Sequence, residues 1–217
     1  MVKLSERVTR VRAPNPSAMT LSGTNSYVID VGAGEAVVID PGPPIDSHVD
    51  RLAATATEAR LDIRAILVTH GHPDHAPAAA RLRERTGAPV FAHEKASFAH
   101  QKALADRDVL EYSRATIRAI DAPGHTDDHL VFFLEDERTL FTGDVVVGEG
   151  TVVIAPPRGD MRAYQKTLHR LRGEFDGAEA MFGGHGPEMR DVTGKLNDYV
   201  AHRELREAQL LAALIAH

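Results

Sequence analysis

Three histidines and one aspartate fall within six residues, in the segment His70-Gly-His-Pro-Asp-His75. Burying so many imidazole and carboxylate groups without partners is costly, whereas a divalent metal uses both groups as natural ligands. The chain has no cysteine, which excludes thiolate nucleophiles and cysteine-held metals. The segment therefore predicts a metal site, and the alternative is a solvated polar loop.

Three further candidates for metal ligands follow downstream, each directly after a glycine in a predicted loop. A single loop histidine is more often a surface or core residue than a ligand, but a preceding glycine lets backbone and metal approach closely. The ordered set of seven side chains is specific, and it comprises His70, His72, Asp74, His75, His125, Asp144 and His185.

The predicted elements place these side chains at the ends of strands. The apolar run at 64–69 predicts a buried strand that ends at the first histidine, where α/β proteins open a cleft. The other predicted elements are a hairpin at 27–40, helices at 47–60 (Ser47 as N-cap), 76–86 (ended by Gly87), 160–173 (starting at Asp160) and 195–215, and strands at 89–92, 116–120, 129–134, 138–142 and 178–184. Such alternation indicates stacked α and β layers.

Composition is that of one compact globular domain, with 217 residues, 43% hydrophobic residues and a net charge of −6. No apolar run approaches the roughly 18 residues of a membrane span, and the first residues lack the apolar core of a secretory signal. We therefore expect a cytoplasmic protein that does not enter a membrane. The net negative charge of the chain gives no general electrostatic attraction to nucleic acid. We expect a solvated surface, rather than phosphate binding, for Arg81, Arg83, Arg85, Arg158 and Arg162.

Over about residues 18–190, the ligand order resembles that of the metallo-β-lactamase fold superfamily. This resemblance implies an α/β fold, a four-layer αβ/βα sandwich. By the family pattern, one metal is held by His70, His72 and His125, and a second by Asp74, His75 and His185. Asp144 bridges the two, with room for a hydroxide between them. We expect two Zn²⁺ ions, with Mn²⁺ or Fe²⁺ as alternatives.

Four stretches resemble the beta-lactamase-like protein 2 group within that superfamily: 15–27, 123–129, 148–151 and 201–209. Members of the group include a single-strand endoribonuclease and polyketide-releasing thioesterases. The resemblance implies a hydrolase domain at 1–194 and a C-terminal amphipathic helix at 195–217. We expect the group's small winged-helix appendage to be absent.

Several residues near the ligand motifs have roles that the sequence leaves open. By the resemblance, Asp40 orients a ligand histidine, although an aspartate before Pro-Gly also starts turns. The catalytic candidates are Asp74, which could orient the attacking water while it binds metal, and His129. For His129, substrate contact or proton donation, support of a ligand and simple packing all stay open. Thr24 and Asn25 resemble a family motif without a readable chemistry.

These observations predict a dinuclear metal-dependent hydrolase in which a bridging hydroxide attacks a phosphodiester, a thioester or ester, or a lactone. The substrate is then a small molecule or single-stranded RNA. One alternative is an iron-dependent redox enzyme on the same fold. Another is a protein that binds single-stranded nucleic acid without catalysis.

The C-terminal helix carries an apolar stripe at partly helical spacing, which must be buried somewhere. The stripe comprises Leu196, Tyr199, Val200, Leu210, Leu211 and Leu214. We expect part of the helix to pack on its own domain and its end to meet another chain in a homo-oligomer. The alternative is that the whole stripe docks on its own domain. The remaining histidines, among them His48 and His217, are expected to be structural or solvent-facing.

Overall fold

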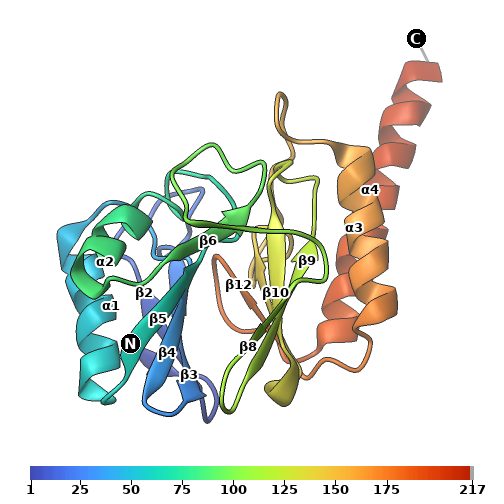
Figure 1. The fold of residues 1–217 in the computed structure, drawn as a ribbon. Helices are drawn as coiled ribbons and strands as arrows, with labels where there is room; N and C mark the ends of the chain where they lie inside the picture. The colour runs from blue at the N-terminus through green and yellow to red at the C-terminus, as the bar shows by residue number, and fades with distance from the viewer. Residues whose placement is uncertain (216–217) are drawn as a thin grey trace.

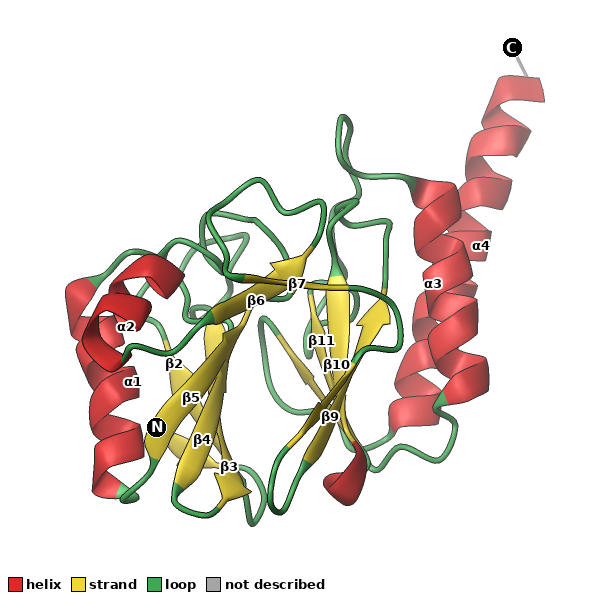
Figure 2. Ribbon diagram, in the orientation of Figure 1, coloured by secondary structure: helices red, strands yellow, loops and turns green. Residues whose placement is uncertain are grey.

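Four layers make up the computed structural model, which describes residues 1–215; His217 lies outside the described residues. Two β-sheets face each other, and a pair of helices covers the outer face of each sheet (Figures 1 and 2). Helices α1 (Asp46–Glu58) and α2 (Ala78–Thr86) cover the first sheet, and α3 (Met161–Glu174) and α4 (Val192–Ile215) cover the second. The predicted αβ/βα sandwich is confirmed.

The two sheets are built from consecutive parts of the chain. The first has the order β1 (Val2–Lys3), β2 (Val8–Arg12), β3 (Asn25–Gly32), β4 (Glu35–Ile39), β5 (Asp62–Leu67), β6 (Val90–His93) and β7 (Lys102–Leu104). The second has the order β12 (Ala180–Gly183), β11 (Thr139–Gly143), β10 (Leu130–Leu134), β9 (Thr116–Asp121) and β8 (Val109–Glu111), with a short 3₁₀ helix at Glu135–Glu137. Strands β4 to β7 pair in parallel, as do β11 and β12.

Each sheet packs on both of its faces, because successive residues of a strand point to opposite sides. On β4, Val37 faces the other sheet, while Val38 packs among the residues of α1 and α2. On β11, Phe141 lies between the sheets and Leu140 packs toward α3 and α4. This arrangement gives a central core and two outer cores, and it fixes the strand ends from which the predicted ligands project.

The boundaries of α1, α2 and α3 lie close to the predicted ones, but one predicted cap is wrong. Ser47 is not the N-cap that the sequence suggested: α1 begins at Asp46, and no side chain caps it. Asp160 does cap α3, since its carboxylate accepts a hydrogen bond from the backbone N–H of Ala163. Gly87 ends α2 with a φ of +73°, as predicted.

Helix α4 is only partly packed. It begins at Val192 rather than Lys195, and its buried residues are Val192, Leu196, Tyr199 and Val200. Its end runs past α3 (Figure 1), and the exposed apolar side chains there are Leu205, Leu210, Leu211, Leu214 and Ile215. Partial docking is thus confirmed and full docking of the stripe is wrong. Within residues 1–215, no helix is both long and apolar enough to cross a bilayer.

Candidate metal centre

All seven predicted ligands meet at one edge of the two sheets. Each follows the carboxyl end of a strand, namely β5, β9, β11 or β12, and such ends open into a shared cleft in α/β folds. The side chains form two adjacent groups, within each of which the ligand atoms lie within 4.8 Å of one another. The first group is His70, His72, His125 and Asp144, and the second is Asp74, His75 and His185.

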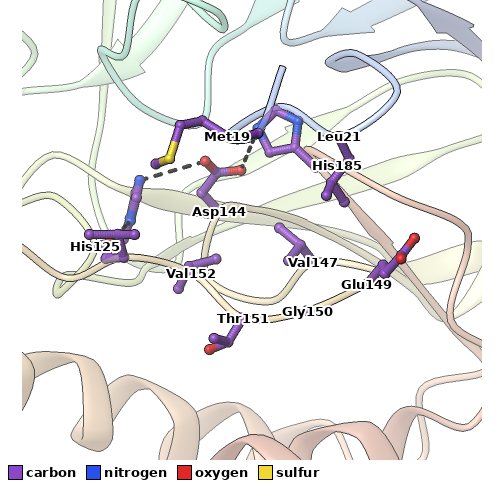
Figure 3. A pocket seen from close by; sticks show the side chains of 12 residues that line it. Met19, Leu21, His125, Asp144, Val147, Glu149, Gly150, Thr151, Val152 and His185 are labelled. Carbon is purple, nitrogen blue, oxygen red and sulfur yellow. Dashed lines mark hydrogen bonds and ion pairs between the residues drawn. The ribbon is translucent and has the colours of Figure 1, made fainter. Parts of the chain in front are cut away.

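Asp144 stands between the two groups and turns one oxygen toward each. Its Oδ2 lies 3.6 Å from His125 Nε2 and 3.9 Å from His70 Nε2. Its Oδ1 lies 3.5 Å from both His75 Nε2 and His185 Nε2. Figure 3 shows this carboxylate between His125 and His185. Asp144 is therefore the residue whose carboxylate faces both groups.

A buried hydrogen-bond network around Asp40 orients two of the predicted ligand histidines. His75 Nδ1 donates to Asp40 Oδ2 at 2.8 Å, and Thr69 Oγ1 donates to the same oxygen at 2.7 Å. With its hydrogen committed to Asp40, the Thr69 hydroxyl accepts from His70 Nδ1 at 3.0 Å. Both rings therefore have their Nδ1 hydrogen committed to these partners, so Nε2 is the atom that faces the cluster and, in its deprotonated form, can bind a metal. Asp40 thus orients a predicted ligand histidine, as the resemblance implied.

His125 is oriented from a different segment. Its Nδ1 donates to the backbone carbonyl of Val153 at 2.9 Å. Its Nε2 faces His72 Nδ1 at 3.0 Å, and His70 Nε2 faces the same atom at 2.9 Å. The ring nitrogens of His70, His72 and His125 therefore face one another at one point. His70 and His125 carry their hydrogen on Nδ1, so their Nε2 atoms have no hydrogen to donate there.

The donor set fits bound cations. His75 Nε2 and Asp144 Oδ1 are buried without a hydrogen-bond partner, although buried polar atoms in proteins are usually satisfied. Converging imidazole lone pairs and carboxylate oxygens are stabilised together by a divalent cation, and Zn²⁺ takes both kinds of ligand. The residues present therefore fit two ions, one in each group.

Electrostatics differ between the two groups. In the first group, burial is the largest cause that lowers the pKa values of His70, His72 and His125 from their ordinary value. These rings are neutral near pH 7, which is the form that binds a metal.

In the second group, the facing carboxylates dominate. Burial alone would lower the pKa values of His75 and His185, but the charge and hydrogen bonds of Asp144 and its neighbours raise the first well above 6.5 and the second to about 9. Burial would raise the pKa values of Asp74 and Asp144, yet the same histidines lower both. The group therefore holds protons where a metal would bind, and metal binding there releases them.

Comparison with known proteins decides the family. Residues 19–185 match the sequence profile of the metallo-beta-lactamase superfamily. The chain belongs to this superfamily. A beta-lactamase-like protein 2 homolog from Caenorhabditis elegans is 30% identical over 227 residues, which cover 99% of this chain and 73% of that protein.

Two further relatives extend the comparison. An atrochrysone carboxyl ACP thioesterase from Cryptosporiopsis sp. is 33% identical over 98% of the chain, and the chain spans 64% of that protein's length. The crystal structure of a metallo-beta-lactamase family protein from Thermus thermophilus has a TM-score of 0.83 at 25% identity, covering 98% of this chain and 84% of that one. The sheet edge that carries the seven predicted ligands thus belongs to a fold that this chain shares with known members of the superfamily.

In this superfamily member, the first residue of β3 and the residue before it support the second ligand group. Thr24 Oγ1 donates to Asp74 Oδ2 at 2.9 Å. Asn25 Nδ2 donates to the backbone carbonyls of Gly183 and Gly186, both at 3.0 Å, and so holds the chain on both sides of His185. The sequence had singled out this motif without finding its chemistry, because its partners lie 50 or more residues away.

His129 does not reach the cleft. Its side chain is fully buried, and its ring stacks on that of His70 with centroids 4.7 Å apart. Its Nε2 accepts a hydrogen bond from the backbone N–H of Asp144 at 3.1 Å. Of the roles that the sequence left open, this geometry favours the support of ligands over contact with substrate.

The cleft over the ligands has walls from two loops. It comprises two adjoining cavities of about 280 and 410 Å³. Their apolar walls come from 18–21 and 147–157, including Met19, Leu21, Val147, Val152, Val153, Ala155, Pro156 and Pro157. Figure 3 shows Met19, Leu21, Val147 and Val152 around the first cavity. Glu149 is a charged residue at the rim.

The arginines do not create a phosphate site at this cleft. Arg158 is the single Lys or Arg among the described residues that line it, and it pairs with Asp127 at 2.7 Å and Asp128 at 2.9 Å. On α2, Arg81 and Arg85 pair with acidic side chains of α1. The predicted solvated role fits Arg81, Arg83 and Arg85 of α2, which are all exposed, whereas Arg158 lies in the cleft wall with its charge paired to two aspartates.

Proposed function

We propose that this protein is a dinuclear metal-dependent hydrolase that cleaves acyl thioesters or related esters and lactones. The single observation that carries the proposal is Asp144, whose two oxygens face two separate ligand groups. Imidazole nitrogens and carboxylate oxygens in these numbers suit two Zn²⁺ ions, with Mn²⁺ or Fe²⁺ as alternatives.

Two divalent ions held by these groups would supply Lewis acidity and lower the pKa of a water molecule. The protein's own part begins with Asp74, whose side chain is partly exposed. Its contacts with Thr24, His75 and His185 all use Oδ2, which leaves Oδ1 to accept a hydrogen bond from the attacking water. Asp74 thereby orients the water and is placed to take its proton.

The cleft favours an uncharged acyl centre over a phosphodiester. Its walls are mainly apolar, Glu149 adds a negative charge, and the positive charge of Arg158 is met by two aspartates. Beyond the two proposed metal ions, a phosphate group entering this cleft would lose hydration without meeting an unpaired Lys or Arg side chain among the described residues that line it. An apolar acyl chain instead gains from burial against Met19 and Val153. The thioesterase names of relatives such as the Cryptosporiopsis protein support the same class.

A panel assay on metal-loaded protein tests this function. Acyl thioesters of N-acetylcysteamine with short and long chains, aryl lactones, bis-p-nitrophenyl phosphate and single-stranded RNA are compared at equal enzyme concentration. We expect turnover of thioesters or lactones that rises with acyl length, and no comparable turnover of the two phosphodiesters. Cleavage of RNA alone, or RNA binding without any turnover, would overturn the proposed substrate class.

Elemental analysis of the same preparation tests the metal content. We expect two zinc ions per chain after loading and dialysis. One ion or none would contradict the dinuclear site. Iron at the site together with oxygen consumption would instead support the redox alternative.

A further inference from the structure

A hydrogen-bonded chain of three side chains runs from the N-terminal loop into the second ligand group. Asn15 Nδ2 lies 3.0 Å from Thr24 Oγ1, and Thr24 Oγ1 lies 2.9 Å from Asp74 Oδ2. Thr24 has no exposed surface, and Asn15 is half-buried. The chain connects a loop outside the ligand motifs to Asp74, which is the proposed ligand and water-orienting residue.

The direction of this chain is fixed by hydrogen-bond chemistry. Asn15 Oδ1 accepts from the backbone N–H of Thr24 at 2.9 Å, so the Nδ2 of the same amide is turned to the Thr24 hydroxyl and donates to it. The hydroxyl has one hydrogen, and the carboxylate of Asp74 is an acceptor. The Thr24 hydrogen is therefore committed to Asp74 Oδ2.

As a consequence, the two oxygens of Asp74 become inequivalent. Oδ2 accepts from Thr24 and also faces His75 Nε2 and His185 Nε2, each at 3.3 Å. Oδ1 makes none of these contacts. A group such as the Thr24 hydroxyl, which donates a hydrogen bond to a metal-binding carboxylate, fixes the orientation of that carboxylate. The loss of such a group typically weakens metal binding.

The same two residues close the base of a cleft wall. Asn15 and Thr24 bracket the loop 16–23, which carries Met19 into both cavities. Two more hydrogen bonds add to this closure: Ala13 N–H donates to the Thr24 carbonyl at 2.8 Å, and the Thr20 hydroxyl donates to the Asn15 carbonyl at 2.5 Å. The wall that would contact the substrate is therefore anchored at the residue that orients Asp74.

We propose that Asn15 and Thr24 are positioning residues that hold Asp74 in the orientation needed by the second metal and by the attacking water. The inference rests on the proposed dinuclear function. The role concerns one of the two metal sites, because the side chains of Asn15 and Thr24 contact the second ligand group only through Asp74. Loss of the Thr24 hydroxyl should therefore weaken one metal-binding event and spare the other.

The test compares Thr24→Val with Thr24→Ser and with Thr55→Val as a matched control. Thr55 is also a buried threonine, and its hydroxyl donates to a backbone carbonyl on α1, away from the cleft. Metal-free protein is titrated with Zn²⁺ against a chromophoric chelator, which resolves two affinities. We expect Thr24→Val to weaken one affinity about 10–100-fold and leave the other unchanged. Thr24→Ser should restore it, and Thr55→Val should match the unmodified protein.

Other outcomes overturn the inference in distinguishable ways. Two unchanged affinities in Thr24→Val, or equal weakening of both, overturn the positioning role while the dinuclear function stands. Binding of a single ion by the unmodified protein overturns both. If Thr24→Val does not fold, Asn15→Ala serves instead, because it removes the donor that fixes the hydroxyl. It should weaken the same affinity by a smaller factor, and an unchanged affinity would overturn the role.

Discussion

The backbone amide of Asp144 donates a hydrogen bond of 3.1 Å to Nε2 of His129, a ring with no exposed surface. Because Nε2 is the acceptor, the ring is neutral with its proton on Nδ1. Burial is the largest cause that lowers the pKa of His129 well below its ordinary value, which agrees with the neutral form. His129 thus supports the residue that faces both ligand groups.

Replacing His129 by leucine should leave the Asp144 amide buried without an acceptor. We expect a loss of about 1–3 kcal/mol in the free energy of unfolding, measured by urea denaturation of the metal-free protein, together with weaker metal binding. His129→Gln, whose side-chain oxygen can replace Nε2 as acceptor, should recover most of both. A His129→Gln variant that is fully stable and loaded with metal, yet inactive, would point to a direct chemical role instead.

Asp144→Ala should abolish turnover while the fold persists. Removing the shared carboxylate leaves two cation sites facing each other with less compensating charge, so we expect activity to fall at least about 100-fold, as for other metal-site groups. Circular dichroism of the metal-free variant should match that of the unmodified protein. Asp144→Asn, which keeps the size but not the charge, separates charge from packing, and retained turnover in both variants would refute the shared role.

Asp40→Asn should disturb two histidines through a change of one atom. The carboxylate accepts from the backbone N–H and the hydroxyl of Thr69 and from His75 Nδ1, so an amide nitrogen in this place would face a donor. We expect a metal affinity about 10–100-fold lower, measured by chelator competition. Asp30→Asn, outside the metal centre, provides the control. Equal affinities in the two variants would contradict a role for Asp40.

His48 should make stability depend on pH below neutrality. It is buried with its Nε2 2.8 Å from Ser26 Oγ, and burial lowers its pKa from 6.5 to about 4. Between these values, the unfolded chain binds a proton at His48 that the folded chain does not bind. Stability therefore falls as the pH drops from 6.5 to 4, by a total of about 3 kcal/mol.

Urea denaturation of metal-free protein across this pH range measures the effect of His48. The variant His48→Gln keeps a polar group near Ser26 but does not titrate there. We expect the free energy of unfolding to fall less steeply in the variant as the pH drops. Parallel slopes for the two proteins would show that His48 makes no contribution.

The end of α4 offers an apolar surface, and association of two or more chains through it remains our prediction. We expect light scattering to show a mass that rises with concentration above the 23.6 kDa of one chain. The double variant Leu210→Glu/Leu214→Glu should stay monomeric, because charged side chains oppose apolar burial. Gln209→Glu adds a charge without removing an apolar side chain and serves as the control. A monomer at high concentration in the unmodified protein would exclude the oligomer.

The sequence alone determined the features that depend on short-range spacing. Residues 70–75 place four ligand-type side chains in one loop after a buried strand, and no distant contact is needed to recognise a metal motif there. The start of α3 at Asp160, the hairpin of β3 and β4, and the end of α2 at Gly87 likewise follow from local capping and strand periodicity.

Tertiary structure alone decided what the distant residues do. Gly143 was expected to let a metal approach, but a Cβ there would lie 2.8 Å from the His129 ring and 2.7 Å from Thr69 Oγ1, so the glycine makes room for side chains that support ligands. The partners of Thr24 and His129 come from the loops that follow β5 and β11, and only the meeting of the two sheet edges makes the first a donor to Asp74 and the second an acceptor from Asp144. Such directional contacts depend on positions in space set by the packed sheets, which spacing along the chain does not encode.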